Sequence, residues 1–203
     1  MSKLDIGTGL GLGAIVAGLG AGAYAFYVGF IGLEPRTSLP AAPWTISGFL
    51  GDIWPAISAL PLSHEAQTIV AAHAAFESGW GRATPAKLAN NVLNVTRGTG
   101  NPTAYWAGEC LKSGDLECDA GGACVKITQD FRKYNDLASS VNDYFYTVLG
   151  TWVRYRASLA ALESGDPEGF IRELGAAGYY TLSADKYVAR WMPVFNEVMA
   201  KLM

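Results

Sequence analysis

The strongest constraint on the fold is a long uncharged segment near the start of the chain. From Ile6 to Leu33 the sequence reads IGTGLGLGAIVAGLGAGAYAFYVGFIGL and contains no charged side chain. A helix needs about 20 apolar residues to cross a bilayer, so this segment is long enough to span one with some tilt. We therefore predict one transmembrane helix within residues 1–33, which contacts the lipid bilayer through residues 6–33.

Four other interpretations of this segment stay open: a cleaved signal peptide, a buried soluble helix, a flexible Gly-rich tail, and a helix on the membrane surface. The apolar run is long for a signal peptide, and Pro43 directly follows the small-residue pair at 41–42 and hinders cleavage there. An uncleaved single-pass anchor is therefore favoured. Its glycines at four-residue spacing permit close helix–helix contacts in the membrane or in an assembly; they are Gly9, Gly13, Gly18 and Gly22.

The rest of the chain reads as a spacer and one domain. Residues 34–43, EPRTSLPAAP, are Pro-rich and typical of a stiff, extended spacer. Residues 44–203 then have a normal length for a single domain. The formal charge of −3 over 203 residues gives no basic field, so we expect no nucleic-acid partner.

Three cysteines, Cys110, Cys118 and Cys124, fall close together in the sequence. The cluster indicates one disulfide in an oxidising compartment, with one thiol left over and the pairing undetermined. Zinc is a weaker interpretation, because the spacings are not CxxC and both histidines lie far upstream. We expect no metal and no cofactor.

One helix ends in a carboxylate. Ser63 is a good N-cap, and Ala66, Ile69, Val70, His73 and Glu77 recur at the spacing of a single helix face. Gly79 and Gly81 are expected to end this helix. Glu77 therefore projects from the core-facing side where the helix stops, which predicts a position on the floor of a cleft.

The later segments predict a small β-lobe followed by more helices. Val125, Ile127, Gln129 and Phe131 alternate as in a strand, so residues 105–131 are expected to form a small hairpin or lobe. Helical periodicity returns after Leu137, and Asp166 with Pro167 starts a further helix. A last helix begins near Tyr187, with a bend expected at Pro193. The predicted class is α+β, a mostly helical domain with a small β-lobe.

Four motifs in this order resemble glycoside hydrolase family seventy-three, the bacterial and phage endo-β-N-acetylglucosaminidases. The motifs, in chain order, are ESGWG at 77–81, NNVLNV at 90–95, FRKY at 131–134 and GYYT at 178–181. The resemblance covers roughly residues 63–191. It implies a lysozyme-like fold and cleavage of the peptidoglycan glycan chain.

The resemblance also assigns roles. Glu77 takes the place of the family's general acid, and Tyr179 that of a tyrosine facing the acid across the cleft. A general acid must hold its proton near neutral pH, and burial on an apolar helix face near Trp80 is expected to raise the pKa of Glu77. The alternative for Glu77 is a surface position near a helix end, and for Tyr179 a packing role.

The second carboxylate is expected in the β-lobe. Glu117 stands fourteen residues before Phe131, close to the family spacing, and is the first choice. Glu109, Asp115 and Asp119 are rivals, and an acidic loop without a catalytic role is an equal alternative. Water activation by such a carboxylate and assistance by the substrate's acetamido group both stay open.

Further residues are candidates for binding sugar. Asn91 and Asn94 are expected to shape the cleft floor, although asparagine is also an ordinary turn residue. The aromatic candidates are Trp80, Tyr105, Trp106 and Tyr180, with burial as the alternative. His73 is interpreted as a core histidine with satisfied hydrogen bonds.

The sequence therefore predicts a membrane-anchored peptidoglycan hydrolase that cuts the β-1,4 glycan backbone, as an endo-β-N-acetylglucosaminidase or a muramidase. The expected setting is the virion membrane of a phage whose lysin opens the cell wall. Two alternatives are a bacterial envelope-assembly enzyme and a catalytically silent structural or glycan-binding membrane protein.

Overall fold

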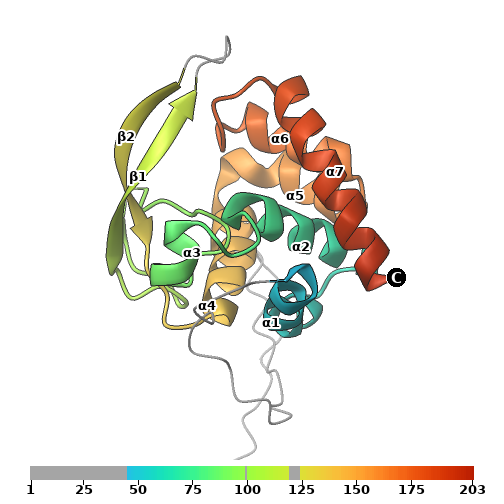
Figure 1. Ribbon diagram of the computed structural model, residues 1–203, viewed down its shortest axis with the longest axis horizontal. Coiled ribbons are helices and arrows are strands. Elements are labelled where there is room, and N and C mark those ends of the chain that lie inside the picture. Colours follow the sequence, from blue (N-terminus) through green and yellow to red (C-terminus); the bar gives the residue numbers. More distant parts are fainter. Residues whose placement is uncertain (1–44, 99, 119–123) are drawn as a thin grey trace, which may run out of the picture. The chain divides into compact units, whose positions relative to one another are not determined.

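The computed structural model describes residues 45–98, 100–118 and 124–203; the side chains of residues 115–118 and 124 lie outside that description. The described part is mostly helical, with one two-stranded sheet. The hairpin lies on one side, helices α5 to α7 lie on the other, and α2 runs between them (Figure 1). In chain order the elements are α1 (Ile46–Ser58), α2 (His64–Ser78), α3 (Thr84–Ala89), β1 (Cys110–Cys118), β2 (Cys124–Arg132), α4 (Leu137–Asn142), the π-helix η1 (Asp143–Leu149), the 3-10 helix η2 (Val153–Tyr155), α5 (Arg156–Glu163), α6 (Pro167–Ala176) and α7 (Ala184–Leu202).

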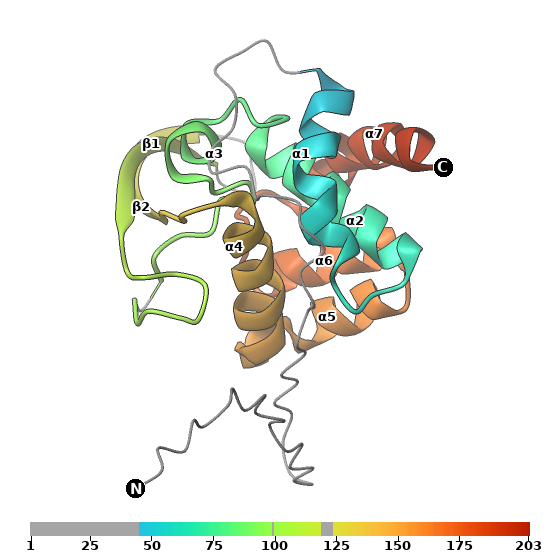
Figure 2. The ribbon, with the colours of Figure 1, turned by 90° about the horizontal axis from the view of Figure 1, so that it is seen from below.

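Helix α2 is the centre of the domain. Every residue from Ala66 to Ala75 is buried, and many of them are alanine, so neighbouring helices approach its backbone closely. Helix α1 packs against both α2 and α4, as Figure 2 shows from below. The predicted caps are confirmed: the Ser63 side chain accepts a hydrogen bond from the Ala66 amide, and Gly79 ends the helix in the left-handed conformation at φ 55°.

The predicted β-lobe is confirmed as a hairpin. Strands β1 and β2 pair antiparallel in a register that runs from Cys110 opposite Arg132 to Cys118 opposite Cys124. Cys110 is a free, half-buried thiol. The side chains of the other two cysteines lie outside the described part of the chain, so the predicted disulfide stays a prediction.

A buried ion pair ties the hairpin to the helices. Arg132, at the end of β2, donates from Nη1 to Oδ2 of Asp143 at 2.6 Å, and these side chains are 2% and 0% exposed. Tyr134 donates to the same carboxylate at 2.7 Å, and so does Thr103, also at 2.7 Å. Because Asp143 opens η1, this single carboxylate connects the β-lobe, the loop before it and the helical half.

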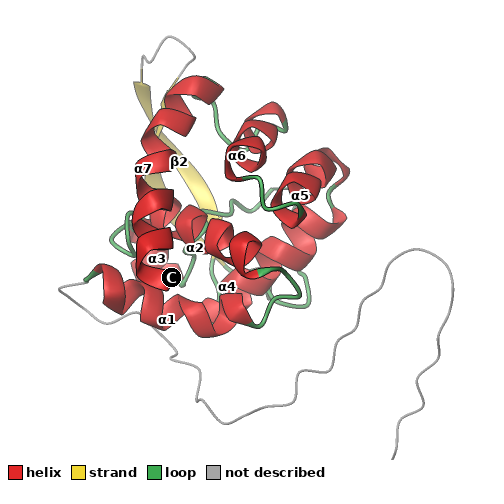
Figure 3. Ribbon diagram, turned by 90° about the vertical axis from the view of Figure 1, so that its right-hand side faces the viewer, coloured by secondary structure: helices red, strands yellow, loops and turns green. Residues whose placement is uncertain are grey.

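The C-terminal helices close the other side of α2. Helix α6 packs against both α5 and α7, and α7 also packs against α2 (Figure 3). The N-cap predicted at Asp166 is confirmed, since its carboxylate accepts from the Gly169 amide at 2.9 Å. Helix α7 continues as one helix through Pro193, and Trp191, two residues before that proline, is fully buried.

The predicted anchor and spacer, residues 1–33 and 34–43, lie outside the described residues. Within 45–98, 100–118 and 124–203, no helix is long and apolar enough to cross a membrane.

Removal of the Asp143 charge is expected to destabilise the domain strongly. In Asp143→Asn the buried Arg132 guanidinium loses its counter-charge, which costs about 3–5 kcal/mol for a buried pair. The matched control is Glu109→Gln, because Glu109 forms an exposed ion pair with Lys133 at 3.0 Å, and such pairs contribute only about 0–1 kcal/mol. Urea unfolding measures both variants, and equal losses would show that the Asp143 network is not what joins the two halves.

Candidate functional site

Glu77 lies in the last turn of α2 and opens into a cleft of about 330 Å³. That volume is within the usual range of small-ligand sites, roughly 300–1,000 Å³. The other walls come from the hairpin, from η1 and η2, from residues 178–181 and from the first turn of α7. The side chain of Glu77 is 13% exposed, so its carboxylate faces the cleft but is largely shielded from water. Glu77 therefore faces a cleft, as the sequence predicted.

Three side chains approach the Glu77 carboxylate. The Tyr187 hydroxyl, from α7, donates a hydrogen bond to Oε1. Asn94 donates from Nδ2 to Oε2 at 3.2 Å and to the Glu77 backbone carbonyl at 2.6 Å. His73 Nε2, one turn earlier in α2, lies 3.5 Å from Oε1, which is a long contact.

The pKa of Glu77 is lowered, which corrects the sequence-based expectation of a raised pKa. Burial is the largest influence and by itself raises the pKa of this carboxyl. The proximity of the His73 ring and the hydrogen bonds from Tyr187 and Asn94 together outweigh burial and stabilise the anion. The expectation counted burial alone, because these partners are set by the fold.

His73 is more closely tied to the carboxylate than its interpretation as a core histidine implied. It is fully buried, and its Nδ1 is 2.9 Å from the Tyr144 hydroxyl. Phe170 and Tyr179 flank the ring, at 5.5 and 5.3 Å between centroids. Among the described residues its Nε2 has no hydrogen-bond partner and points to Glu77 at contact distance. His73 therefore contributes to the environment of the carboxylate.

The tyrosine whose hydroxyl contacts the Glu77 carboxylate is Tyr187, a residue that the sequence did not predict at the site. Tyr179 lines the cleft, but its hydroxyl donates to the Leu93 backbone carbonyl. Tyr180 also lines the cleft; its hydroxyl donates to the Ile171 carbonyl at 2.9 Å, and its ring stacks on Tyr187 at 3.7 Å. Burial raises the pKa of the Tyr179 and Tyr187 hydroxyls well above the ordinary value, so both act as neutral donors.

Of the two asparagines predicted at the cleft, only Asn94 lines it. Asn91 is fully buried, and its amide binds backbone atoms: Nδ2 donates to the carbonyls of Val95 and Arg132 at 2.8 and 2.9 Å, and Oδ1 accepts from the Val95 amide. Asn91 therefore fixes the loop that carries Asn94.

Three predicted aromatic residues are not among those lining the cleft. Trp80, in the left-handed conformation at φ 59°, packs edge-on against Phe49 at 6.1 Å. Trp106 is 1% exposed beneath the Arg132 guanidinium, 4.4 Å from the ring centroid. Tyr105 stacks on Tyr146 at 5.8 Å. Each of the three rings packs against a residue distant in the sequence, and this contact determines where the ring lies.

The β-lobe carboxylates are only partly described. Glu109 is exposed and paired with Lys133, so it does not line the cleft. Glu117 lies in β1 opposite Val125, four residues from Ser113, whose partner Gln129 does line the cleft. The side chains of Glu117 and Asp115, and all of Asp119, lie outside the described residues. Among the described lining residues, Glu77 is the only acidic one.

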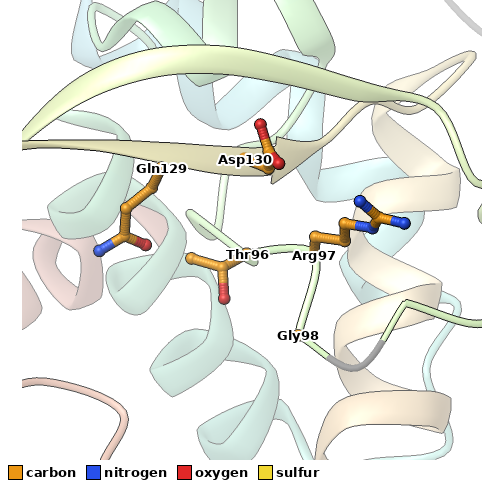
Figure 4. A pocket seen from close by; sticks show the side chains of 5 residues that line it. All are labelled: Thr96, Arg97, Gly98, Gln129 and Asp130. Atoms are coloured by element: carbon orange, nitrogen blue, oxygen red, sulfur yellow. The ribbon is translucent and has the colours of Figure 1, made fainter.

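The cleft adjoins a second hollow that the sequence did not predict. Thr96 and Gln129 line both, and the hollow is completed by Arg97, Gly98 and Asp130 (Figure 4). Trp152 and Arg154, also unpredicted, line the main cleft. The residues of the hollow and the pair Trp152 and Arg154 are far apart in the sequence and form no sequence motif. They come together only in the fold, where Trp152 lies beside Gly98 in the loop after Asn94.

Loss of the Tyr187 hydroxyl is expected to raise the pKa of Glu77. A hydrogen bond donated to the carboxylate stabilises its charged form, so Tyr187→Phe is expected to move the pKa of Glu77 upward. The control is Tyr180→Phe, which keeps the stacked ring and removes a hydroxyl bonded elsewhere. Carbon NMR of the labelled glutamate carboxyl measures both; a shift in the control alone, or in neither, contradicts the assignment of Tyr187.

Comparison with known proteins places this site in a family. A family model described as mannosyl-glycoprotein endo-beta-N-acetylglucosaminidase matches residues 58–199. Two curated relatives, each a peptidoglycan hydrolase FlgJ, are 32% identical over 117 residues in Vibrio parahaemolyticus and 31% identical over 137 residues in Pseudomonas aeruginosa. These matches cover 56% and 64% of this chain but only 35% and 32% of those proteins, so the chain spans about a third of their length.

Solved structures share the fold. A peptidoglycan hydrolase mutant from Sphingomonas sp. A1 has a TM-score of 0.59 at 22% identity, over 78% of this chain and 99% of that one. The catalytic domain of the autolysin Auto from Listeria monocytogenes has a TM-score of 0.55 at 16% identity, over 79% and 88%. The family model covers well over half of the sequence and includes Glu77, Asn94 and Tyr187. The chain therefore belongs to this endo-β-N-acetylglucosaminidase family, glycoside hydrolase family seventy-three, as its motifs predicted.

Proposed function

We propose that the domain hydrolyses the β-1,4 glycan backbone of peptidoglycan, with Glu77 as the general acid. The observation that carries the proposal is the Glu77 carboxyl, held by side chains from separate elements at the floor of a cleft. The family membership supports a glycosidase, and the peptidoglycan hydrolases among its relatives and structural neighbours support the substrate.

In the proposed reaction Glu77 transfers its proton to the glycosidic oxygen as the bond from that oxygen to the anomeric carbon breaks. Positive charge then develops on the sugar ring in an oxocarbenium-like transition state. Water adds to the anomeric carbon and gives its proton to the general base. The general base then releases that proton to solvent and Glu77 takes one up, so that both groups return to their starting state. In the free protein Tyr187 and Asn94 orient the carboxyl toward the cleft.

Because the pKa of Glu77 is lowered, the carboxyl must gain a proton before it can act as a general acid. In the free protein Glu77 is largely ionised at neutral pH, so only a minor fraction carries the proton. A bound glycan chain excludes water, and its hydroxyl and acetamido groups compete for the donors that now serve the carboxylate. Burial then acts with less opposition and raises the pKa. Proton uptake is therefore expected to accompany substrate binding.

Replacement of Glu77 by glutamine tests the proposal directly. Purified peptidoglycan is incubated with wild type and with Glu77→Gln, and the reducing ends of the products are identified by mass spectrometry. We expect wild type to release products ending in N-acetylglucosamine and the variant to lose at least about 100-fold in rate. Ends in N-acetylmuramic acid would instead identify a muramidase. Equal rates would remove Glu77 from the mechanism, and inactivity of both proteins would favour a silent binding domain.

Water activation is assigned to Glu117 within this proposal. The support is its spacing before Phe131 and its place in β1, four residues from the partner of Gln129 in the cleft wall. We expect Glu117→Gln to slow cleavage by about 100-fold or more, as for loss of a general base. Glu109→Gln, the control in the same lobe, is expected to change the rate by less than about twofold, because its carboxylate is exposed and ion-paired. Full activity in Glu117→Gln would favour assistance by the substrate acetamido group.

We also propose that residues 6–33 anchor the enzyme as a single membrane-spanning helix, with the domain outside the bilayer. The support is the uncharged length of that segment and its glycine spacing. A tethered domain of this size suits a lysin in the membrane of a virion, which opens the wall locally. The alternative is a bacterial envelope-assembly enzyme. Presence of the chain in purified virions separates the two.

A further inference from the structure

Arg154 is held at the cleft wall by two aromatic rings. It belongs to η2 and lines the cleft together with Trp152 and Tyr155. Those rings stack on each other at 6.0 Å and 22°, and the guanidinium carbon lies 5.2 Å from the Trp152 centroid and 4.6 Å from the Tyr155 centroid. Aromatic faces at these distances attract a guanidinium and restrict its plane. The Arg154 guanidinium also hydrogen-bonds the Tyr155 hydroxyl, and because a guanidinium carries five N–H groups, others remain to bind a ligand.

Arg154 also carries a charge that no other cleft residue supplies. Among the described lining residues it is the only basic one, as Glu77 is the only acidic one. Within the described part of the chain, Arg154 forms no ion pair. An acidic group that enters beside the ionised Glu77 is repelled by that carboxylate. A fixed guanidinium in the same cleft offsets this repulsion and accepts a carboxylate in a two-pronged geometry.

The Trp152 ring that holds Arg154 lies beside a residue of the second hollow. Trp152 lies close to Gly98. A Cβ added at Gly98 would be 3.3 Å from Cη2 of the Trp152 indole. Gly98 lines the hollow with Thr96 and Gln129, which also line the cleft (Figure 4). A polymer that passes Glu77 and continues into the hollow therefore passes the Trp152 ring on which Arg154 lies.

We propose that Arg154 is a carboxylate-binding residue of this cleft and selects glycan strands that carry acidic groups over neutral ones. This inference rests on the proposed peptidoglycan activity and names what the site recognises in that substrate. Peptidoglycan strands offer carboxylates in two forms: on the stem peptide where one is attached, and on the lactyl ether of the muramic sugar where none is. Both have the planar shape that a guanidinium binds.

The test measures dissociation constants for three forms of one glycan, with the full chain carrying Glu77→Gln to prevent cleavage. The first form keeps its stem peptides, the second is stripped of them and exposes lactyl carboxylates, and the third has those carboxylates converted to methyl amides. Each form is titrated against three proteins: the Glu77→Gln chain, called the parent, and the parent with Arg154→Gln or with Arg156→Gln added. Arg156 is exposed, lies two residues away and is not among the cleft-lining residues.

We expect Arg154→Gln to weaken binding of an acidic form by about tenfold or more and of the amide form by less than about twofold. The form that loses more affinity, stem-bearing or stripped, identifies which carboxylate Arg154 binds. Arg156→Gln is expected to leave all three unchanged. Equal weakening of all three forms by Arg154→Gln, or no weakening, overturns the inference while leaving the proposed hydrolase intact. Failure of the parent to bind any form overturns the proposed function and this inference with it.

Discussion

The domain depends on keeping a carboxylate buried at a position where its own helix opposes it. Glu77 lies at the C-terminal end of α2, where the backbone carbonyls disfavour an anion, and only 13% of its side chain is exposed. Burial of a charge is costly unless it is hydrogen-bonded. Here Tyr187 from α7, Asn94 from the loop after α3 and His73 from α2 itself supply the compensation. Three separate segments must therefore be packed together before the charge of this one side chain is compensated.

The polar contacts elsewhere keep those segments in place. Asn91 fixes the loop of Asn94 through backbone hydrogen bonds to Val95 and Arg132. Arg132 is in turn paired with Asp143 at the start of η1, and η1 leads to the wall that carries Trp152 and Arg154. Because each of these groups is buried and bonded, displacement of one removes partners from the next. The chemistry of the cleft and the stability of the fold are thus coupled through the same chain of contacts.

The sequence predicted those features that have local causes. Ser63, the apolar spacing in α2 and Gly79 act within a few residues of one another, and together they placed Glu77 at a cleft floor. The alternation in β2 and the cap at Asp166 were equally local. Tyr187 gave no such signal, because it meets Glu77 across 110 residues of sequence. Trp106 and Trp80 were misplaced for the same reason, since Arg132 and Phe49 decide where they pack. The direction of the Glu77 pKa shift was wrong because burial is visible in a sequence pattern and hydrogen-bond partners are not.

The most direct test of the account is the pH dependence of kcat/KM for peptidoglycan cleavage, set beside the NMR titration of Glu77 in the free protein. If Glu77 delivers the proton, kcat/KM reports its protonation in the free enzyme and declines as that carboxyl ionises. The account predicts an alkaline limb whose pKa equals the titrated value and lies below that of an ordinary glutamate. A limb at another pH, or a rate that does not change while Glu77 titrates, would contradict it.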